Sequence, residues 1–240
     1  MKRDRLLIFG HSSLHKRGLV THLDPTSSSA TDGDTAIHPI TLKTKYYTSS
    51  IDVWIDDSDD LDSWTMEYCG NEAREVRDVI NGLVYCSDVK DFDSLEKELG
   101  KVRRVVDVLD EETEGDEEEK EDEGWGGLKV CVLFGGVKED FEDYEDVCLA
   151  NGWECIQLDD KRDFNEFKER VGPMRFKEVV ESHGWADNDA GESEADDEDA
   201  EDFDLIQMVD MLKKEKDRLA SLPDHEREEA AKKFIESLSL

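Results

Sequence analysis

The chain has 240 residues, and its 64 acidic side chains outnumber the 30 basic ones, so the formal net charge is −34. This length suits one domain of ordinary size with some additional sequence, and the charge argues against direct binding to nucleic-acid phosphates or anionic membrane surfaces. Hydrophobic residues make up 37% and charged residues 39%, a balance typical of a chain that is partly folded and partly disordered.

Strands and helices are expected to alternate along the first 186 residues. Short apolar runs and alternating segments predict strands at 5–10, 37–47, 50–55, 79–86, 128–134 and 153–158. The second and third of these form an antiparallel pair, followed by an acidic turn at 56–62. Helices are expected from about residue 17 to 23, at 92–109, at 139–151 and at 164–183, the last with a break at Gly172-Pro173. This order predicts an α/β fold with a six-stranded, mostly parallel sheet, in the topology of a Ras-like (Rossmann-like) GTPase domain.

Two acidic tracts divide the chain. Residues 110–123 and 187–204 hold eleven acids each, with a single lysine in the first tract. We therefore expect an α/β domain at 1–186 with an acidic insertion at 110–124, a disordered linker at 187–202 and a helical hairpin at 203–240. The tracts themselves are read as solvated linkers, with mimicry of an acidic binding sequence as the alternative.

An apolar stripe runs along the expected C-terminal hairpin. Leu205, Leu212 and Leu219 repeat at intervals of seven. The other residues predicted to form this partner-binding surface are Met208, Val209, Leu222 and Phe234. A hairpin of this size cannot bury its own apolar faces well, so it needs another copy or a client protein; docking on the α/β domain is the alternative.

The loop after the first strand is a degenerate form of the phosphate-binding motif G-x-x-x-x-G-K-[ST]. Gly10 and Lys16 match the motif, but His15 stands at the second glycine and Arg17 at the hydroxyl residue that would hold Mg²⁺. Segments 56–60 and 135–140 likewise lack the D-x-x-G and N-K-x-D patterns of GTPases. We therefore predict a pseudo-GTPase that is not an enzyme, with no catalytic residues, metal or cofactor, while residual weak nucleotide binding stays open.

The five cysteines lack the spacing of a zinc site, and nothing indicates an oxidising compartment, so reduced thiols are expected. No apolar run is long enough for a membrane span or a signal peptide. We expect a cytoplasmic protein.

Three segments resemble the alpha- and gamma-adaptin-binding protein family, which includes the fungal increased recombination centers proteins. Segment 46–56 is similar to the family's tyrosine-rich strand pair, and segment 172–185 to its G-x-x-R-x-x-E-A-L-x-x-H-x-W pattern. The third segment is the tail, where the matching residues are Phe203, Leu219, Leu222, Pro223, Arg227, Ala231 and Phe234.

The resemblance implies a pseudo-GTPase that binds clathrin adaptor subunits (adaptins) and acts as an assembly chaperone or regulator in clathrin-coated vesicle traffic. It also implies that the tail contributes to self-association and adaptin contact. Two alternatives are a regulator of Rab-like GTPases and an indirect genome-maintenance factor connected with chromosomal rearrangement or telomere healing.

Overall fold

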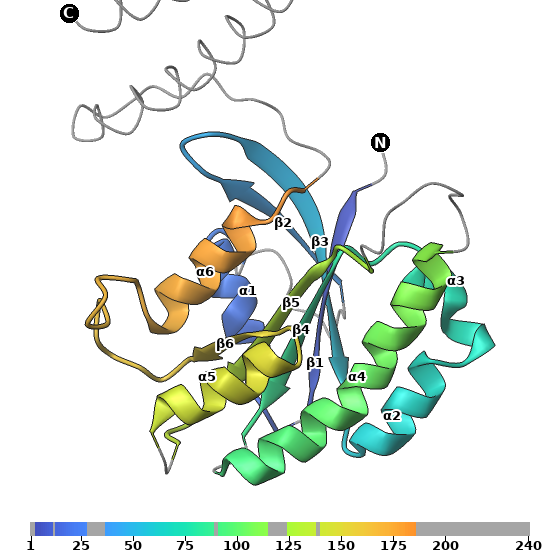
Figure 1. The fold of residues 1–240 in the computed structure, drawn as a ribbon. Coiled ribbons are helices and arrows are strands. Elements are labelled where there is room, and N and C mark those ends of the chain that lie inside the picture. The colour runs from blue at the N-terminus through green and yellow to red at the C-terminus, as the bar shows by residue number, and fades with distance from the viewer. Residues whose placement is uncertain are drawn as a thin grey trace, which may run out of the picture. The chain divides into compact units, whose positions relative to one another are not determined.

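Six strands form one sheet in the order β2-β3-β1-β4-β5-β6 (Figure 1). The computed structural model describes residues 3–11, 13–27, 37–88, 91–114, 124–137 and 140–185. The strands are β1 (Asp4–Gly10), β2 (Ile37–Lys43), β3 (Thr48–Asp57), β4 (Gly82–Ser87), β5 (Leu128–Leu133) and β6 (Glu154–Gln157). Only the β2–β3 pair is antiparallel. The predicted six-stranded, mostly parallel sheet is confirmed.

Helices cover both faces of the sheet. They are α1 (Arg17–Leu23), α2 (Leu61–Tyr68), α3 (Arg74–Arg77), α4 (Phe92–Glu114), α5 (Phe141–Ala150) and α6 (Gly172–Ser182), with a 3₁₀ turn, η2, at Asn71–Ala73. Side chains of α1 and α6 pack on one face, and those of α2, α4 and α5 pack on the other. Because both faces are covered, the central strand β1 buries four consecutive apolar residues, Leu6 to Phe9.

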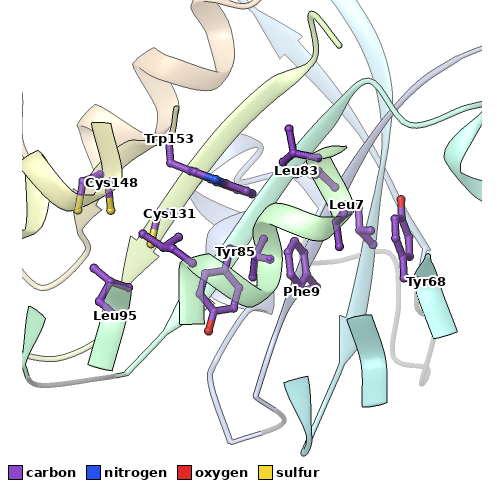
Figure 2. Close-up of a cluster of buried hydrophobic side chains, with 14 of the residues drawn as sticks. Leu7, Phe9, Tyr68, Leu83, Tyr85, Leu95, Cys131, Cys148 and Trp153 are labelled. Carbon is purple, nitrogen blue, oxygen red and sulfur yellow. The ribbon is translucent and has the colours of Figure 1, made fainter. Parts of the chain in front are cut away.

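The larger of the two cores lies beneath α2, α4 and α5 (Figure 2). The predicted apolar stripe of α4 is confirmed, since Leu95, Leu99, Val102, Val105 and Leu109 are all buried. In Figure 2, Cys148 lies at one end of the cluster and Tyr68 at the other, with Phe9 and Tyr85 between them. The five cysteines are free, and four of them are buried.

Helix α2 was not predicted, because residues 56–62 were interpreted only as an acidic turn. Asp60 is its N-cap and accepts the N–H of Asp62 at 3.1 Å. The buried face consists of Trp64, Thr65 and Tyr68, and the Trp64 ring stacks on Phe9 of β1 with 4.2 Å between centroids. The capping aspartate and the i, i+4 aromatic pair were the sequence signals for this helix.

The predicted helix at 164–183 is wrong over its first part. Residues 164–170 form a short loop closed by a β-bridge between Phe164 and Arg170. The Asn165 side-chain oxygen accepts the backbone N–H groups of Phe167 and Glu169, and such bonds compete with helix formation. The helix begins only at Gly172, where Pro173 takes a first-turn position that needs no N–H donor.

Helix α4 extends five residues beyond its predicted end, to Glu114, and so includes the start of the first acidic tract. The predicted linker at 187–202 and the hairpin at 203–240 lie outside the described residues.

Candidate functional site

The degenerate phosphate-binding loop connects the carboxyl end of β1 to the first turn of α1. In a parallel sheet of this kind, ligands bind beyond the carboxyl ends of the strands, so this is where a nucleotide phosphate would lie. Gly10 ends β1 with φ +146°, and the Ser58 N–H from the end of β3 donates to its carbonyl at 2.9 Å. The structure therefore brings the ends of β1 and β3 together beside this loop.

The Lys16 side chain is turned into the loop and is almost completely buried, with 1% of its side-chain surface exposed. Its ammonium group donates to the Gly10 carbonyl at 3.0 Å and to the His11 carbonyl at 2.7 Å, and it forms an ion pair with the Asp57 carboxylate. A lysine ammonium has three N–H donors, and here three acceptors surround it. In this conformation Lys16 has no donor left for a phosphate, and the Asp57 carboxylate adds a negative charge that a phosphate would have to approach.

The acidic residues at the end of β3 and directly after it also have internal partners. Asp56 accepts the indole N–H of Trp64 at 2.7 Å, Asp57 pairs with Lys16, and Asp60 caps α2. The hydrogen bond from Ser63 lowers the pKa of Asp60 below its usual value. His11 lies 3.8 Å from Asp59 at the mouth of the loop. These carboxylates hold the local structure together in the place where a GTPase would present a magnesium-binding aspartate.

The loop after β5 is tied to the loop after β6. The Gly135 N–H donates to the Asp159 carboxylate at 2.5 Å. Gly135 begins the segment in which a GTPase would carry the N-K-x-D motif that recognises guanine. Over the described part of the chain, no group of three histidine, cysteine or acidic side chains could hold a metal ion. None of the helices in the described ranges is long and apolar enough to cross a membrane.

Of the predicted site residues, the structure brings Gly10 and Lys16 together in one loop. The predicted partner-binding residues Leu205, Met208, Val209, Leu212, Leu219, Leu222 and Phe234 lie outside the described residues. Sequence reasoning missed Asp57, the acceptor that neutralises Lys16. Asp57 falls in the predicted acidic turn at 56–62, directly after the predicted strand at 50–55, and that position was the only signal for it.

Two of the three segments that carry the family resemblance contact each other. Tyr47, in the turn between β2 and β3, donates its hydroxyl proton to the Glu181 carbonyl of α6. Trp185 closes the second segment, is 1% exposed, and donates its indole N–H to the Val180 carbonyl at 2.8 Å. Both of these aromatic residues therefore act as structural contacts of the α/β domain.

Replacing Lys16 by methionine is expected to lower the free energy of unfolding by about 2 kcal/mol, since two loop carbonyls lose hydrogen bonds from a charged donor. The matched control is Lys101→Met. Lys101 pairs with Asp62 at 2.6 Å, but both side chains are exposed, so we expect a loss of about 0.5 kcal/mol or less. Urea unfolding followed by tryptophan fluorescence measures both values. Equal losses would show that the buried Lys16 stabilises the domain no more than the exposed Lys101 does.

Similar proteins are known among curated sequences and solved structures, although no family model matches the chain. An Increased recombination centers protein 6 from Candida dubliniensis is 28% identical over 231 residues, which is 82% of this chain and 82% of the relative. The protein of the same name from Candida tropicalis is 27% identical over 232 residues, with the same coverage of both chains. The predicted resemblance to the increased recombination centers proteins is confirmed.

The fold resembles a crystal structure of yeast Irc6p, which is described as a novel type of conserved clathrin accessory protein. The TM-score is 0.53 and the sequences are 17% identical, with coverage of 78% of this chain and 96% of the yeast chain. At this level of identity the likeness supports the fold alone.

Proposed function

We propose, from the similarity to the increased recombination centers proteins and to a clathrin accessory protein, that this chain is a non-enzymatic accessory protein of clathrin-related trafficking. Its α/β domain is a GTPase-like scaffold, since the strand order β2-β3-β1-β4-β5-β6 with only β2 antiparallel is that of a Ras-like domain. Its clients are clathrin adaptor subunits, which it holds before assembly.

The observation that carries the non-enzymatic assignment is the buried Lys16. A lysine that grips phosphate must point out of its loop, whereas this one is satisfied by Gly10, His11 and Asp57. Without nucleotide chemistry, surfaces that bind other proteins must perform the function. Isothermal titration with Mg·GTP and Mg·GDP is expected to show no heat of binding, and low-micromolar binding of either nucleotide would contradict the assignment.

The C-terminal stripe is the proposed adaptor contact. Leu212→Asp and Leu219→Asp, made as two single variants, are each expected to abolish the capture of purified adaptor subunits by the tagged full-length protein. The reason is that a charge cannot be buried in an apolar interface without a partner. Gln207→Asp adds one charge outside the apolar stripe and is the matched control. The melting of the α/β domain is expected to stay unchanged in all three variants.

Two outcomes would contradict this part of the proposal. Binding that survives both leucine substitutions places the contact elsewhere, and adaptor subunits that fail to bind the unmodified chain exclude them as clients. Binding to a Rab-like GTPase in only one nucleotide state would instead favour the alternative that this chain regulates Rab-like GTPases.

The name of the relatives favours a second candidate, an indirect role in genome maintenance. The net charge of −34 opposes direct contact with DNA, so such a role would act through other proteins. A DNA mobility shift with the purified chain would contradict that indirect role.

A further inference from the structure

Within the described residues, β6 forms one edge of the sheet, and beside it lies a groove that the proposed function does not use. Strand β6 is the last strand of the sheet, and α5 and residues 160–172, which lead into α6, lie on either side of it (Figure 1). A groove of about 460 Å³ is lined by residues of all three. Cys155, Ile156 and Gln157 of β6 line the groove, together with Glu142 and Glu145 of α5. The groove therefore joins the outer side of the last strand to one face of a helix.

The backbone of β6 presents hydrogen-bonding groups to this groove. The Leu158 N–H donates to the Leu133 carbonyl across the β5–β6 ladder at 3.0 Å. Because successive residues of a strand direct their N–H and C=O groups to opposite edges, those of Cys155 point away from β5. An extended chain laid along β6 could pair with them, as in the strand addition by which several domains bind peptides.

The groove is acidic. Seven of its lining residues carry carboxylates, against three arginines. Two of the arginines are engaged within the domain: Arg162 with Asp160 at 2.7 Å, and Arg175 with Glu154 at 2.7 Å. Most of the remaining carboxylate charge is therefore available to a cationic side chain of a ligand.

Glu145 is the carboxylate best suited to receive such a cation. None of the described basic residues forms an ion pair with it, and partial burial together with the nearby Glu154 and Glu169 carboxylates raises its pKa. A positive charge beside Glu145 would relieve this repulsion, so a lysine or arginine of a partner is complementary to the groove.

One large exposed apolar side chain lines the groove, and two others are exposed on the loop and the helix that flank it. Phe167 lines it and is 76% exposed, and Phe164 of the same loop is 50% exposed. Leu149 is 73% exposed and lies one helical turn after Glu145, on the same face of α5. Exposed aromatic side chains of this size are frequent hot spots of protein interfaces.

The loop that carries the two phenylalanines is held in shape by its own hydrogen bonds. Asn165 accepts the N–H groups of Phe167 at 3.0 Å and Glu169 at 2.9 Å, and the Arg170 guanidinium lies 5.4 Å from the centroid of the Phe164 ring. A loop that is ordered before binding loses less conformational entropy when a partner docks.

We propose that this edge binds an extended segment of a partner protein in which lysine or arginine alternates with large apolar side chains. The segment lies along β6, pairs with the backbone of Cys155, places a cation beside Glu145 and packs an apolar side chain against Phe167. This inference is independent of the adaptor contact proposed for the tail, because it uses only residues of the α/β domain.

The test uses the full-length protein and a fluorescein-labelled hexapeptide of alternating leucine and arginine, with binding measured by fluorescence anisotropy at 0.15 M salt. Glu145→Lys and Phe167→Ser are each expected to weaken binding by about thirtyfold, the smallest effect that defines a hot-spot contact. The matched controls are Glu111→Lys, an exposed acid on α4, and Met66→Ser, an exposed apolar residue on α2, and both are expected to stay within about twofold.

The controls separate this site from general attraction to an acidic protein. Equal weakening by Glu145→Lys and Glu111→Lys would overturn the proposal, because the peptide would then be following net charge alone. Equal affinity for a hexapeptide of alternating serine and arginine would overturn it as well, since the apolar contacts would then contribute nothing to the affinity. If light scattering shows a dimer that Phe167→Ser dissociates, a second copy of this chain occupies the edge instead, and the proposal fails.

Discussion

Replacing Gly10 by alanine is expected to lower the free energy of unfolding by about 3–5 kcal/mol, the largest effect of any single substitution considered for this domain. Gly10 has φ +146°, a conformation that side-chain-bearing residues rarely adopt. A Cβ atom there would stand 2.3 Å from the Cys86 carbonyl oxygen of the neighbouring strand β4. Both the backbone strain and the steric clash oppose the substitution, and neither can be relieved by moving a flexible side chain.

The matched control is Gly100→Ala in the middle of α4. No atom lies within 4 Å of the position that its Cβ would take, so this substitution is expected to stabilise the domain by about 0.5–1 kcal/mol through helix propensity. Urea unfolding of the full-length variants measures both effects. A loss below about 1 kcal/mol for Gly10→Ala would mean that the end of β1 can move away from β4 without cost.

Arg77→Met is expected to cost about 3 kcal/mol, the second largest effect. The Arg77 side chain is 2% exposed and donates to the carbonyls of Tyr68 and Gly70 and, through two nitrogens at 2.8 and 2.7 Å, to the Glu112 carboxylate. Methionine keeps most of the buried volume but leaves all of these acceptors without their donor. The substitution also removes the contact that holds the last turn of α4 against the end of α2.

The pH dependence of the partner residue provides a separate test. The hydrogen bond from Arg77 is the main cause that lowers the pKa of Glu112, so its contribution is complete above the unfolded-state pKa near ~4.3 and disappears as the pH falls through the folded value. Glu112→Gln is therefore expected to be destabilising at pH 7, and this destabilisation is expected to shrink progressively as the pH falls below the unfolded-state pKa. Glu111→Gln, which changes an exposed neighbour, is expected to show no such convergence, and a constant difference for Glu112→Gln across the pH range would contradict the pairing.

The order of strands and helices could be predicted because burial leaves a periodic trace in the sequence. The stripe of α4 identified that helix, and four consecutive apolar residues from Leu6 to Phe9 identified a strand covered on both faces. Prediction from this periodicity was wrong where side-chain hydrogen bonds decide the local structure. Asp60 starts a helix that was interpreted as a turn, and Asn165 closes a loop that was interpreted as a helix.

The α/β class, the mostly parallel sheet and the degenerate phosphate-binding loop could all be inferred from the amino-acid sequence. They follow from local periodicity and from the residue types at the positions of a motif. Three features became visible only in the folded domain: what Lys16 binds, that β6 forms an edge of the sheet, and that Arg77 meets Glu112 across 35 positions of the chain. Local patterns report which face of a segment is buried. They do not report which distant residue will lie opposite, since that depends on how the whole sheet is ordered and twisted.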